Sequence, residues 1–443
     1  MAQVDDRAAG GPVADASAPA SMVSSAVLST VGIGVQGVSR LAYTVLIGRA
    51  FGTEALGHAS ALLSLSIFVA LLWPTAAGNT VSRFIALALH RRVSDARLIV
   101  LFNRSLLVSS AVLAVATVPV ALSLGNGLVT AILAAWLVVG YGAYAYCRGV
   151  QLGYHRARRV AVWDTAGSML SLGLLVAVCL GQAGHLVLLP LALGYTVFAV
   201  ACRPRGNGLT DDGALHDEDE DEDEDERAAL RFAAWNVVAG LTTNGLLQLA
   251  MIAAQVFAPG TGAGVYAAAF TLATPASMLG QAVSQIIIPA FAHRNGQVSL
   301  RQRGPVLLLV SFTAVFAVVF GALAALAPVY LPLFYPAEAP SAVPLLQTLI
   351  VGVFVFTVAL IPSALLLSAG RSRAVALSSI AGFVVGVAVM LATGSSLGEQ
   401  AGTAGFVAGS GLNLVVLLVV GFWSPVRRAV GDTDQTKRRA TDQ

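Results

Sequence analysis

The most constraining feature of the sequence is a series of apolar stretches, each of 18 residues or more, that recurs from about residue 24 to residue 424. A helix of that length crosses a hydrocarbon layer of about 30 Å. Only 11% of the residues are charged and 57% are hydrophobic, whereas a soluble domain carries about 25% charged residues. The pattern therefore predicts an all-α polytopic membrane protein with about twelve transmembrane helices.

The connections between these stretches alternate in charge. Of the 26 Lys and Arg residues, 22 fall in the two tails or in every second connection. Cytoplasmic loops carry such an excess, so both termini are expected to be cytoplasmic and the chain to lie in the plasma or inner membrane. The predicted spans cover residues 24 to 48, 58 to 84, 98 to 122, 128 to 147, 161 to 181, 186 to 202, 232 to 257, 264 to 291, 305 to 330, 342 to 369, 374 to 395 and 401 to 423.

An acidic run divides the spans into two sets of six. Residues 211 to 226 read DDGALHDEDEDEDEDE, and a block of like charge cannot bury apolar surface, so it is expected to be disordered. Two interpretations stay open, a solvated linker and an interaction site for a basic cytoplasmic partner. The predicted organisation is a disordered cytoplasmic tail (1–23), an N-lobe (24–202), an acidic cytoplasmic linker (203–231), a C-lobe (232–424) and a basic cytoplasmic tail (425–443).

A weak internal repeat agrees with the division into two sets. GTEALGHASA at residues 52 to 61 opens the second span, and GTGAGVYAAA at residues 260 to 269 opens the eighth. The match is short and rich in alanine. Together with the central linker it favours two homologous lobes, a plan in which transporters place the substrate site between the repeats.

Four arginines, Arg40, Arg49, Arg83 and Arg104, lie in or near predicted spans. An arginine at the centre of a membrane helix costs roughly 2.5 to 3.5 kcal/mol. Arg40 falls with Ser29, Gln36 and Tyr43 within about 80° of the first helix, which makes a polar stripe. A guanidinium presents a fork of donors to phosphate, so an anionic cargo would offset the cost. Arg49 lies on another face and is expected to serve the fold, tied to Glu54.

Polar residues on three further spans extend the candidate site. Arg83 lies near a cytoplasmic end and could instead snorkel to the interface. The amides could contact sugar hydroxyls, and they could equally hold helices together across the bundle. The predicted substrate-binding residues are Gln36, Arg40, Tyr43, Asn79, Arg83, Asn244, Gln248, Gln281 and Gln285.

Carboxylates are scarce in the predicted spans. Outside the tails and the linker, only Asp164 approaches the membrane interior. An exporter driven by protons or sodium usually needs a buried carboxylate for the coupling ion, and the first span has none, which disfavours a drug antiporter. An anionic cargo could instead be driven outward by the membrane potential. Prolines 74, 275, 289 and 362 interrupt spans, as hinges or as static bends.

The sequence gives little support to an enzyme. It contains neither GxxxxGK[ST] nor HExxH, its six histidines are scattered, and its outer loops are too short for a membrane glycosyltransferase. Cys147, Cys179 and Cys202 have no metal or disulfide spacing and are expected to be packing residues. We expect no cofactor, no metal and no nucleic-acid partner. A facilitator-superfamily transporter and a membrane scaffold are further alternatives, although LHRRVSDARL lacks the Gly-rich Asp-Arg pattern of the former.

The segment LIGRAFGTEALGHASALLSL, followed by a span that ends SRFIALAL, resembles the multidrug/oligosaccharidyl-lipid/polysaccharide exporter superfamily, in particular its polysaccharide flippase branch. Arg49, Gly52 and Gly57 match that branch, with His58 where an aromatic residue is more usual, and GVYAAAFTL at residues 264 to 272 looks like the equivalent element. The resemblance implies two six-helix lobes that form a V around a central cavity.

The resemblance also implies a cargo, a polyprenyl-pyrophosphate-linked oligosaccharide, moved from the inner to the outer leaflet by alternating access. Membrane lipid and this lipid-linked glycan are then the expected partners of a monomer. A polysaccharide polymerase or glycosyltransferases would act beside it. The alternative is an ion-coupled multidrug antiporter.

Overall fold

The computed structural model describes residues 18–91, 93–204, 219–275, 302–368 and 371–423. All regular secondary structure in these ranges is helical, and ten of the described helices are long and apolar enough to span a membrane. Lipid offers no hydrogen-bond partner to the backbone, and a helix satisfies its backbone groups internally. The chain is therefore a multi-pass, all-α membrane protein, as predicted.

The helices are separated by short connections. The described elements are α1 (Ala18–Leu72), α2 (Pro74–Arg91), α3 (Ala96–Ser123), α4 (Leu128–Gly153), α5 (Ala157–Leu180), η1 (Gly184–Leu186), α6 (Leu189–Ala201), α7 (Asp219–Gly240), the π-helix η2 (Leu241–Gly245), α8 (Leu246–Phe257), α10 (Arg303–Phe334), α11 (Ala339–Ser368), α12 (Ser372–Leu397) and α13 (Gln400–Trp423). Residues 261–275 are also helical.

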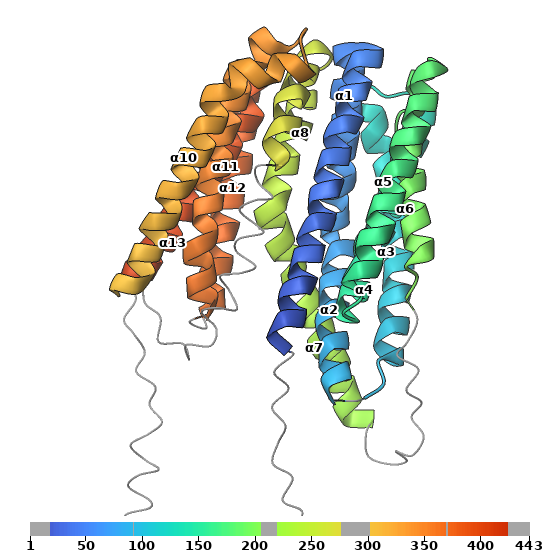
Figure 1. The fold of residues 1–443 in the computed structure, drawn as a ribbon, viewed down its shortest axis with the longest axis vertical. Coiled ribbons are helices and arrows are strands. Elements are labelled where there is room, and N and C mark those ends of the chain that lie inside the picture. Colours follow the sequence, from blue (N-terminus) through green and yellow to red (C-terminus); the bar gives the residue numbers. More distant parts are fainter. Residues whose placement is uncertain (1–17, 92, 205–218, 276–301, 369–370, 424–443) are drawn as a thin grey trace, which may run out of the picture.

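The difference between twelve predicted spans and ten observed ones has two causes. Predicted spans 1 and 2 meet inside α1 at Gly52, whose φ of 85° lies in the left-handed region that favours glycine. Figure 1 shows α1 rising to the upper end of the molecule and the chain returning toward α2. Predicted span 8 is described only as far as Pro275. The predicted span from 232 to 257 corresponds to α7, η2 and α8, which follow one another directly along the chain. Each of the other remaining predicted spans corresponds to one helix.

Pro74 breaks the second span, as its position predicts. Helix α1 ends at Leu72, and α2 begins at Pro74 after a single turn residue, Trp73. Proline supplies no backbone N–H and clashes with the preceding turn. The indole Nε1 of Trp73 donates a hydrogen bond to Ser105 Oγ on α3 (3.1 Å), so the break is anchored to a neighbouring helix.

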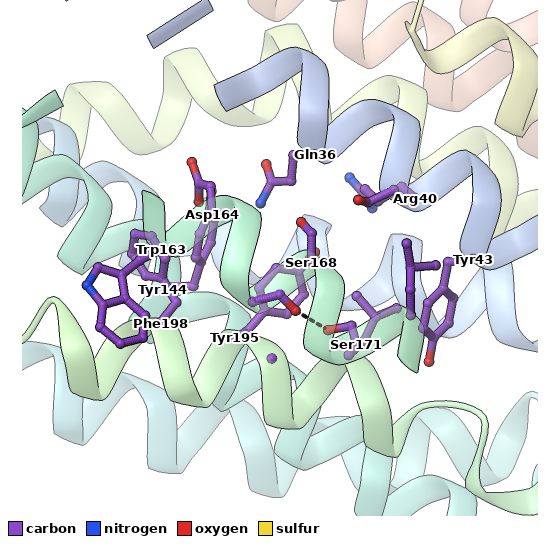
Figure 2. Close-up of a pocket in the computed structure, with 15 residues that line it drawn as sticks. Gln36, Arg40, Tyr43, Tyr144, Trp163, Asp164, Ser168, Ser171, Tyr195 and Phe198 are labelled. Atoms are coloured by element: carbon purple, nitrogen blue, oxygen red, sulfur yellow. Dashed lines mark hydrogen bonds between the residues drawn. The ribbon is translucent and has the colours of Figure 1, made fainter. Parts of the chain in front are cut away.

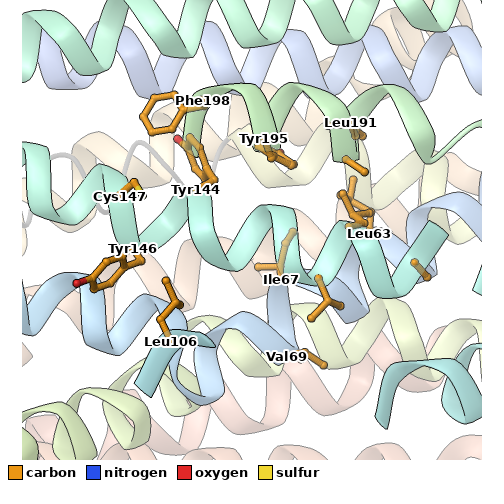
Figure 3. Close-up of a cluster of buried hydrophobic side chains, with 14 of the residues drawn as sticks. Leu63, Ile67, Val69, Leu106, Tyr144, Tyr146, Cys147, Leu191, Tyr195 and Phe198 are labelled. Atoms are coloured by element: carbon orange, nitrogen blue, oxygen red, sulfur yellow. The ribbon is translucent and has the colours of Figure 1, made fainter. Parts of the chain in front are cut away.

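Two large clusters of buried apolar side chains hold the helices together. The first cluster contains side chains from all the helices from α1 through α6, and Figure 3 shows part of it around Tyr144, Tyr195 and Phe198. The second joins α8, residues 261–275, α10, α11, α12 and α13, and also includes Leu56 and Ala61 of α1. We call these groups of helices the N-lobe and the C-lobe. Cys147 and Cys202 are buried and free, which agrees with their expected packing role.

The two lobes form the expected V. In Figure 1, α10 to α13 approach α1 and α8 at the upper end and diverge from α1 toward the lower end. The first and last described helices, α1 and α13, have their free ends at the lower side.

A set of polar contacts, the interlobe junction, joins α1 to the end of α10 and the start of α11. Arg49 donates hydrogen bonds from Nε to Phe334 O (3.3 Å) and from a terminal nitrogen to Leu333 O. These carbonyls lie at the C-terminus of α10, where the helix dipole favours a cation. Thr53 Oγ1 donates to Glu338 Oε1 (2.6 Å). The prediction that Arg49 serves the fold fits this position.

The prediction that Arg49 is tied to Glu54 was wrong. The carboxylate of Glu54 instead lies 3.8 Å from His58 Nε2, one turn along the same helix. The left-handed turn at Gly52 lies between the two residues, so Glu54 continues on a different face of the chain from Arg49. A helical wheel assumes one continuous helix, and it fails across such a turn.

The two segments of the weak sequence repeat contact each other at this junction. A Cβ atom on Gly57 would lie 2.7 Å from Gly264 N, and one on Gly264 would lie 2.0 Å from Thr53 O. Only glycine permits this approach of the two backbones. Tyr335 packs its ring against Gly48, and burial raises the pKa of Tyr335 to about 12, so its hydroxyl stays protonated.

The acidic run differs from the prediction in its second half. Helix α7 begins at Asp219, inside the predicted linker. Asp and Glu in the first turn of a helix interact favourably with its dipole, so carboxylates that repel one another in an extended chain stabilise a helix N-terminus. The domain boundaries themselves stay predictions, and residues 205–218 lie outside the described ranges.

The interlobe junction predicts that Arg49→Gln separates the lobes at this end. In a background with serine at the three cysteine positions, spin labels at His185→Cys and Ala337→Cys would report the distance across the junction by pulsed electron resonance. We expect Arg49→Gln to increase the population at longer distances. If the contact contributes about 1.4 kcal/mol, the ratio of separated to closed molecules should rise about tenfold.

Glu54→Gln is the matched control, because Glu54 pairs only within α1 among the described contacts. It should leave the distance distribution unchanged. A distribution in Arg49→Gln that superposes on the unsubstituted one would show that Arg49 does not hold the lobes together.

Candidate functional site

A small pocket lies inside the N-lobe, between α1, α4, α5 and α6. We call it the N-lobe pocket. Gln36 and Arg40 reach it from α1, and Asp164 and Ser168 reach it from α5 (Figure 2). The stripe predicted on the first span therefore faces a real cavity. Its walls are formed by Gln36, Ser39, Arg40, Tyr43, Tyr144, Trp163, Asp164, Gly167, Ser168, Ser171, Leu172, Leu191, Gly194, Tyr195 and Phe198.

Tyr43 contributes its ring to this pocket, while its hydroxyl serves the fold. The side chain is 2% exposed, and the hydroxyl donates a hydrogen bond to the carbonyl of Val187, which follows η1. Helix α1 is thereby fixed against the connection between α5 and α6. Its neighbour Arg40, one turn earlier, keeps a defined orientation toward the pocket.

An ion pair that sequence reasoning missed borders the same pocket. Arg148 Nε on α4 lies 3.5 Å from Asp164 Oδ2 on α5, and the Asp164 side chain is fully buried. Sequence analysis placed Arg148 in a cytoplasmic loop, whereas α4 extends to Gly153. A signal was present, because the two residues are equally far along the chain from Arg156, which directly precedes α5. An antiparallel helix pair with a short turn brings such positions together.

Aromatic rings form the wall between α4 and α6. The ring centroid of Tyr144 lies 4.6 Å from that of Phe198 and 5.0 Å from that of Tyr195. Such rings supply apolar surface and a face of negative potential that attracts cations. The N-lobe pocket therefore combines a carboxylate, arginines and an aromatic surface in a buried space.

A second small pocket, the interlobe pocket, lies between the lobes. Arg40 lines it as well as the N-lobe pocket. Buried Gln248 on α8 faces Arg40 across it, and the Gln248 Oε1 atom has no hydrogen-bond partner among the described residues. The pocket is lined by Gly37, Arg40, Leu41, Thr44, Ser60, Leu63, Ser64, Gln248, Phe270, Thr271, Thr274 and Pro275.

The structure brings four of the nine predicted residues to these pockets, Gln36, Arg40, Tyr43 and Gln248. Asn79 and Arg83 are exposed on α2 and line neither pocket. The guanidinium of Arg83 lies 4.4 Å from the ring centroid of Phe232 on α7, so a cation–π contact stabilises its position. Asn244 lies in η2. Gln281 and Gln285 lie outside the described residues.

Metal ligands do not gather in the part of the chain that the structure describes. No group of three or more His, Cys, Asp or Glu residues there could hold a metal ion. The polar groups available for binding are therefore guanidinium, carboxylate, amide and hydroxyl groups.

Sequence comparison finds no match, neither to a family model nor to a curated protein. Solved structures do match. An inward-facing multidrug resistance MATE family transporter of the MOP superfamily shares 16% identity over 87% of this chain and 93% of its own, with a TM-score of 0.69. An outward-facing multidrug resistance MATE family transporter of the MOP superfamily gives a TM-score of 0.59, with 15% identity over 90% of this chain and 94% of its own.

A third structure differs in its pocket. It is a MOP superfamily transporter from Pyrococcus furiosus whose reverse polarity of the binding pocket suggests a different function, with 17% identity over 90% of this chain and 94% of its own and a TM-score of 0.57. The chain thus has the MATE-like fold of MOP superfamily transporters, and its helices resemble the inward-facing arrangement more than the outward-facing one. These comparisons lend the polysaccharide branch no specific support.

The interpretation of the carboxylates changes with the structure. Sequence analysis disfavoured an ion-coupled antiporter because the first span carries no carboxylate. Asp164, on the fifth span, lies 3% exposed and lines the same pocket as Arg40 of the first. Helix packing places a carboxylate beside the first span from a different part of the chain, which a span-by-span reading does not reveal.

The Arg148–Asp164 pair predicts a specific pattern of stability. Removing one partner of a buried pair leaves an uncompensated charge and costs about 3 to 5 kcal/mol. Asp164→Asn and Arg148→Gln should therefore each lower the temperature of unfolding in detergent, and the double variant should lose less than the sum of the two.

Arg158→Gln is the control, since Arg158 is exposed at the start of α5 and its loss should change stability by less than about 0.5 kcal/mol. Strict additivity in the double variant would show that the two groups do not interact.

Proposed function

We propose that the chain is a membrane transporter that works by alternating access, and that an ion-coupled MATE-like antiporter is its best-supported form. The observation that carries this proposal is the carboxylate of Asp164, buried in the N-lobe pocket of a fold otherwise seen in MATE transporters. Buried ionisable groups in membrane spans typically mark ion and substrate pathways. In this proposal Asp164 binds the coupling ion, and Arg148 pairs with the carboxylate when that ion is absent.

The arrangement of the lobes supports alternating access. They meet at the interlobe junction and diverge toward the side of the described termini (Figure 1). The alternation of basic and neutral connections along the sequence predicts that this side is cytoplasmic. The pockets would then be reached from the cytoplasm in this state, and transport would require the junction to open while the other ends close.

A second candidate is the flipping of a lipid-linked oligosaccharide, and Arg40 is the observation that favours it. This guanidinium lines both pockets, and the interlobe pocket adds Gln248 and the hydroxyls of Ser60 and Ser64. Guanidinium groups bind phosphate, and amides and hydroxyls bind sugars. At 4 Å an Arg–phosphate contact contributes about 4 kcal/mol at an effective dielectric of 20. The fold comparisons support the antiporter better than this second candidate.

Two substitutions separate the candidates, because each mechanism depends on a different charge. In the antiporter, Asp164→Asn should abolish export driven by an imposed proton or sodium gradient in proteoliposomes, whereas Arg40→Ala should retain coupled transport. In the flippase, Arg40→Ala should abolish cell-surface polysaccharide, whereas Asp164→Asn should leave it near normal if the protein is inserted.

Two readouts are matched to the candidates: the sensitivity of a deletion strain to cationic dyes and the amount of its surface glycan. For each substituted protein, its abundance in the membrane is the control. Dye sensitivity with intact glycan supports the antiporter. Coupled export that survives in folded Asp164→Asn would contradict the role given to Asp164, and normal glycan in Arg40→Ala would contradict the flippase.

A further inference from the structure

A histidine connects the two lobes beside the interlobe junction. His58 lies shortly after Gly52, in the part of α1 where the chain turns back at the upper end of the molecule (Figure 1). Gln255 on α8 belongs to the other lobe, and its Nε2 atom lies 3.4 Å from Nδ1 of His58. The transport mechanism proposed above assigns no role to either residue.

The hydrogen bond across this contact depends on the charge of His58. An amide donates through its nitrogen, and a neutral imidazole has one donor and one acceptor nitrogen. Neutral His58 therefore accepts from Gln255 Nε2 through Nδ1 and carries its proton on Nε2. The Oε1 atom of Gln255 is buried and has no hydrogen-bond partner among the described residues. The neutral contact thus leaves a buried acceptor unused, which is costly.

Protonation of His58 supplies the missing donor. Both nitrogens of an imidazolium ion donate, so Nδ1 would face an amide N–H group unless the amide of Gln255 rotates by half a turn. After this rotation Gln255 Oε1 accepts from Nδ1 in a charge-assisted hydrogen bond, which is roughly twice as strong as a neutral one. The other nitrogen, Nε2, lies 3.8 Å from Glu54 Oε1, so the ion pair within α1 keeps the ring oriented toward α8.

The surroundings of His58 allow it to change its charge. Its side chain is 25% exposed, so water reaches the imidazole. The described parts of α8 and of the connection from α3 to α4 carry no titratable side chain near it, and Gly125 of that connection lies against the ring. Element η1 brings the exposed His185, and the helix of residues 261–275 brings Tyr266, which is fully buried. Three further charged residues belong to segments at this end of the lobes, Arg49, Glu338 and Glu399.

Two of these charged residues already have partners in the interlobe junction. Arg49 donates to carbonyls of α10, and Glu338 accepts from Thr53. Glu54 is therefore the charged group that contacts the imidazole of His58.

We propose that His58 and Gln255 form a proton-dependent contact that controls how firmly the lobes hold together at the interlobe junction. Protonation of His58 from the side opposite the described termini strengthens the contact, and deprotonation weakens it. Histidine changes its charge between about pH 5 and 8, so the contact responds to the pH on that side. Opening of the junction belongs to the alternating access proposed above, and the contact rests on this motion but on no particular cargo or coupling ion.

The direction of the pH effect follows from linkage. The closed junction offers protonated His58 an acceptor, Gln255 Oε1, that separated lobes do not offer. The closed form therefore binds the proton more tightly than the separated form. Acidification shifts the equilibrium toward the closed form, and raising the pH reverses the shift.

Pulsed electron resonance with labels at His185→Cys and Ala337→Cys tests this contact in the full-length protein. This pair spans the junction and also removes His185 as a second titrating group. Lowering the pH from about 8 to about 5.5 should lower the ratio of separated to closed molecules about tenfold, because His58 becomes charged over this range. In His58→Gln, and separately in Gln255→Met, the ratio should change by less than about twofold.

His90→Gln is the matched control, since His90 is exposed at the end of α2, and it should keep the full shift. Gln255→Met retains the histidine and removes its acceptor, so it covers the case in which His58→Gln does not fold. A ratio that ignores pH in the otherwise unsubstituted chain, or that still changes about tenfold in folded His58→Gln or Gln255→Met, would overturn the proposal. Loss of coupled export with the pH shift intact would contradict the proposed function and support this contact.

Discussion

The absence of water from the lipid interior governs the whole architecture. A backbone polar group or a charge without a partner costs several kcal/mol there, so the chain forms helices and each embedded charge needs its own compensation. The four membrane arginines show four different solutions. Arg40 faces cavities, Arg49 binds the carbonyl end of a helix from the other lobe, Arg83 lies on an aromatic ring, and Arg104 is exposed on the outer side of α3. Of these four, Arg40 is the one that lines both described pockets.

The contact between the lobes links the fold to the proposed transport. Two backbones approach closely at Gly57 and Gly264, and polar contacts from Arg49 and Thr53 surround them. Close packing around glycine gives two surfaces that either fit or separate, and hydrogen bonds to exposed groups can be exchanged for water at small cost. A junction of this kind can hold one state and still release it. The pockets lie nearer the N-terminus of α1, the same helix that carries the junction. In the proposed mechanism, closure at one end and access at the other therefore both involve α1.

The pairing of Arg148 with Asp164 illustrates where the sequence becomes insufficient. A buried pair of this kind is costly to form and damaging to break, so its presence inside a pocket points to function more than to stability. The local pattern places Arg148 at the end of one span and Asp164 near the start of the next. Which face each residue presents depends on the rotation of two packed helices. Gln36, Arg40 and Tyr43 could be grouped correctly because they share one helix and its 100° step is known.

The sequence by itself determined the membrane class, the alternating charge of the connections and the polar stripe around Arg40, because each depends on composition or on the period of one helix. It also located the glycine-rich segments that later proved to contact each other. Tertiary structure alone decided that spans 1 and 2 join at Gly52, that Arg49 binds the opposite lobe, that Asp164 shares a pocket with Arg40, and that Asn79 and Arg83 line neither pocket. These outcomes depend on distances between residues far apart in the chain, and helix rotation and packing set those distances, which no local pattern encodes.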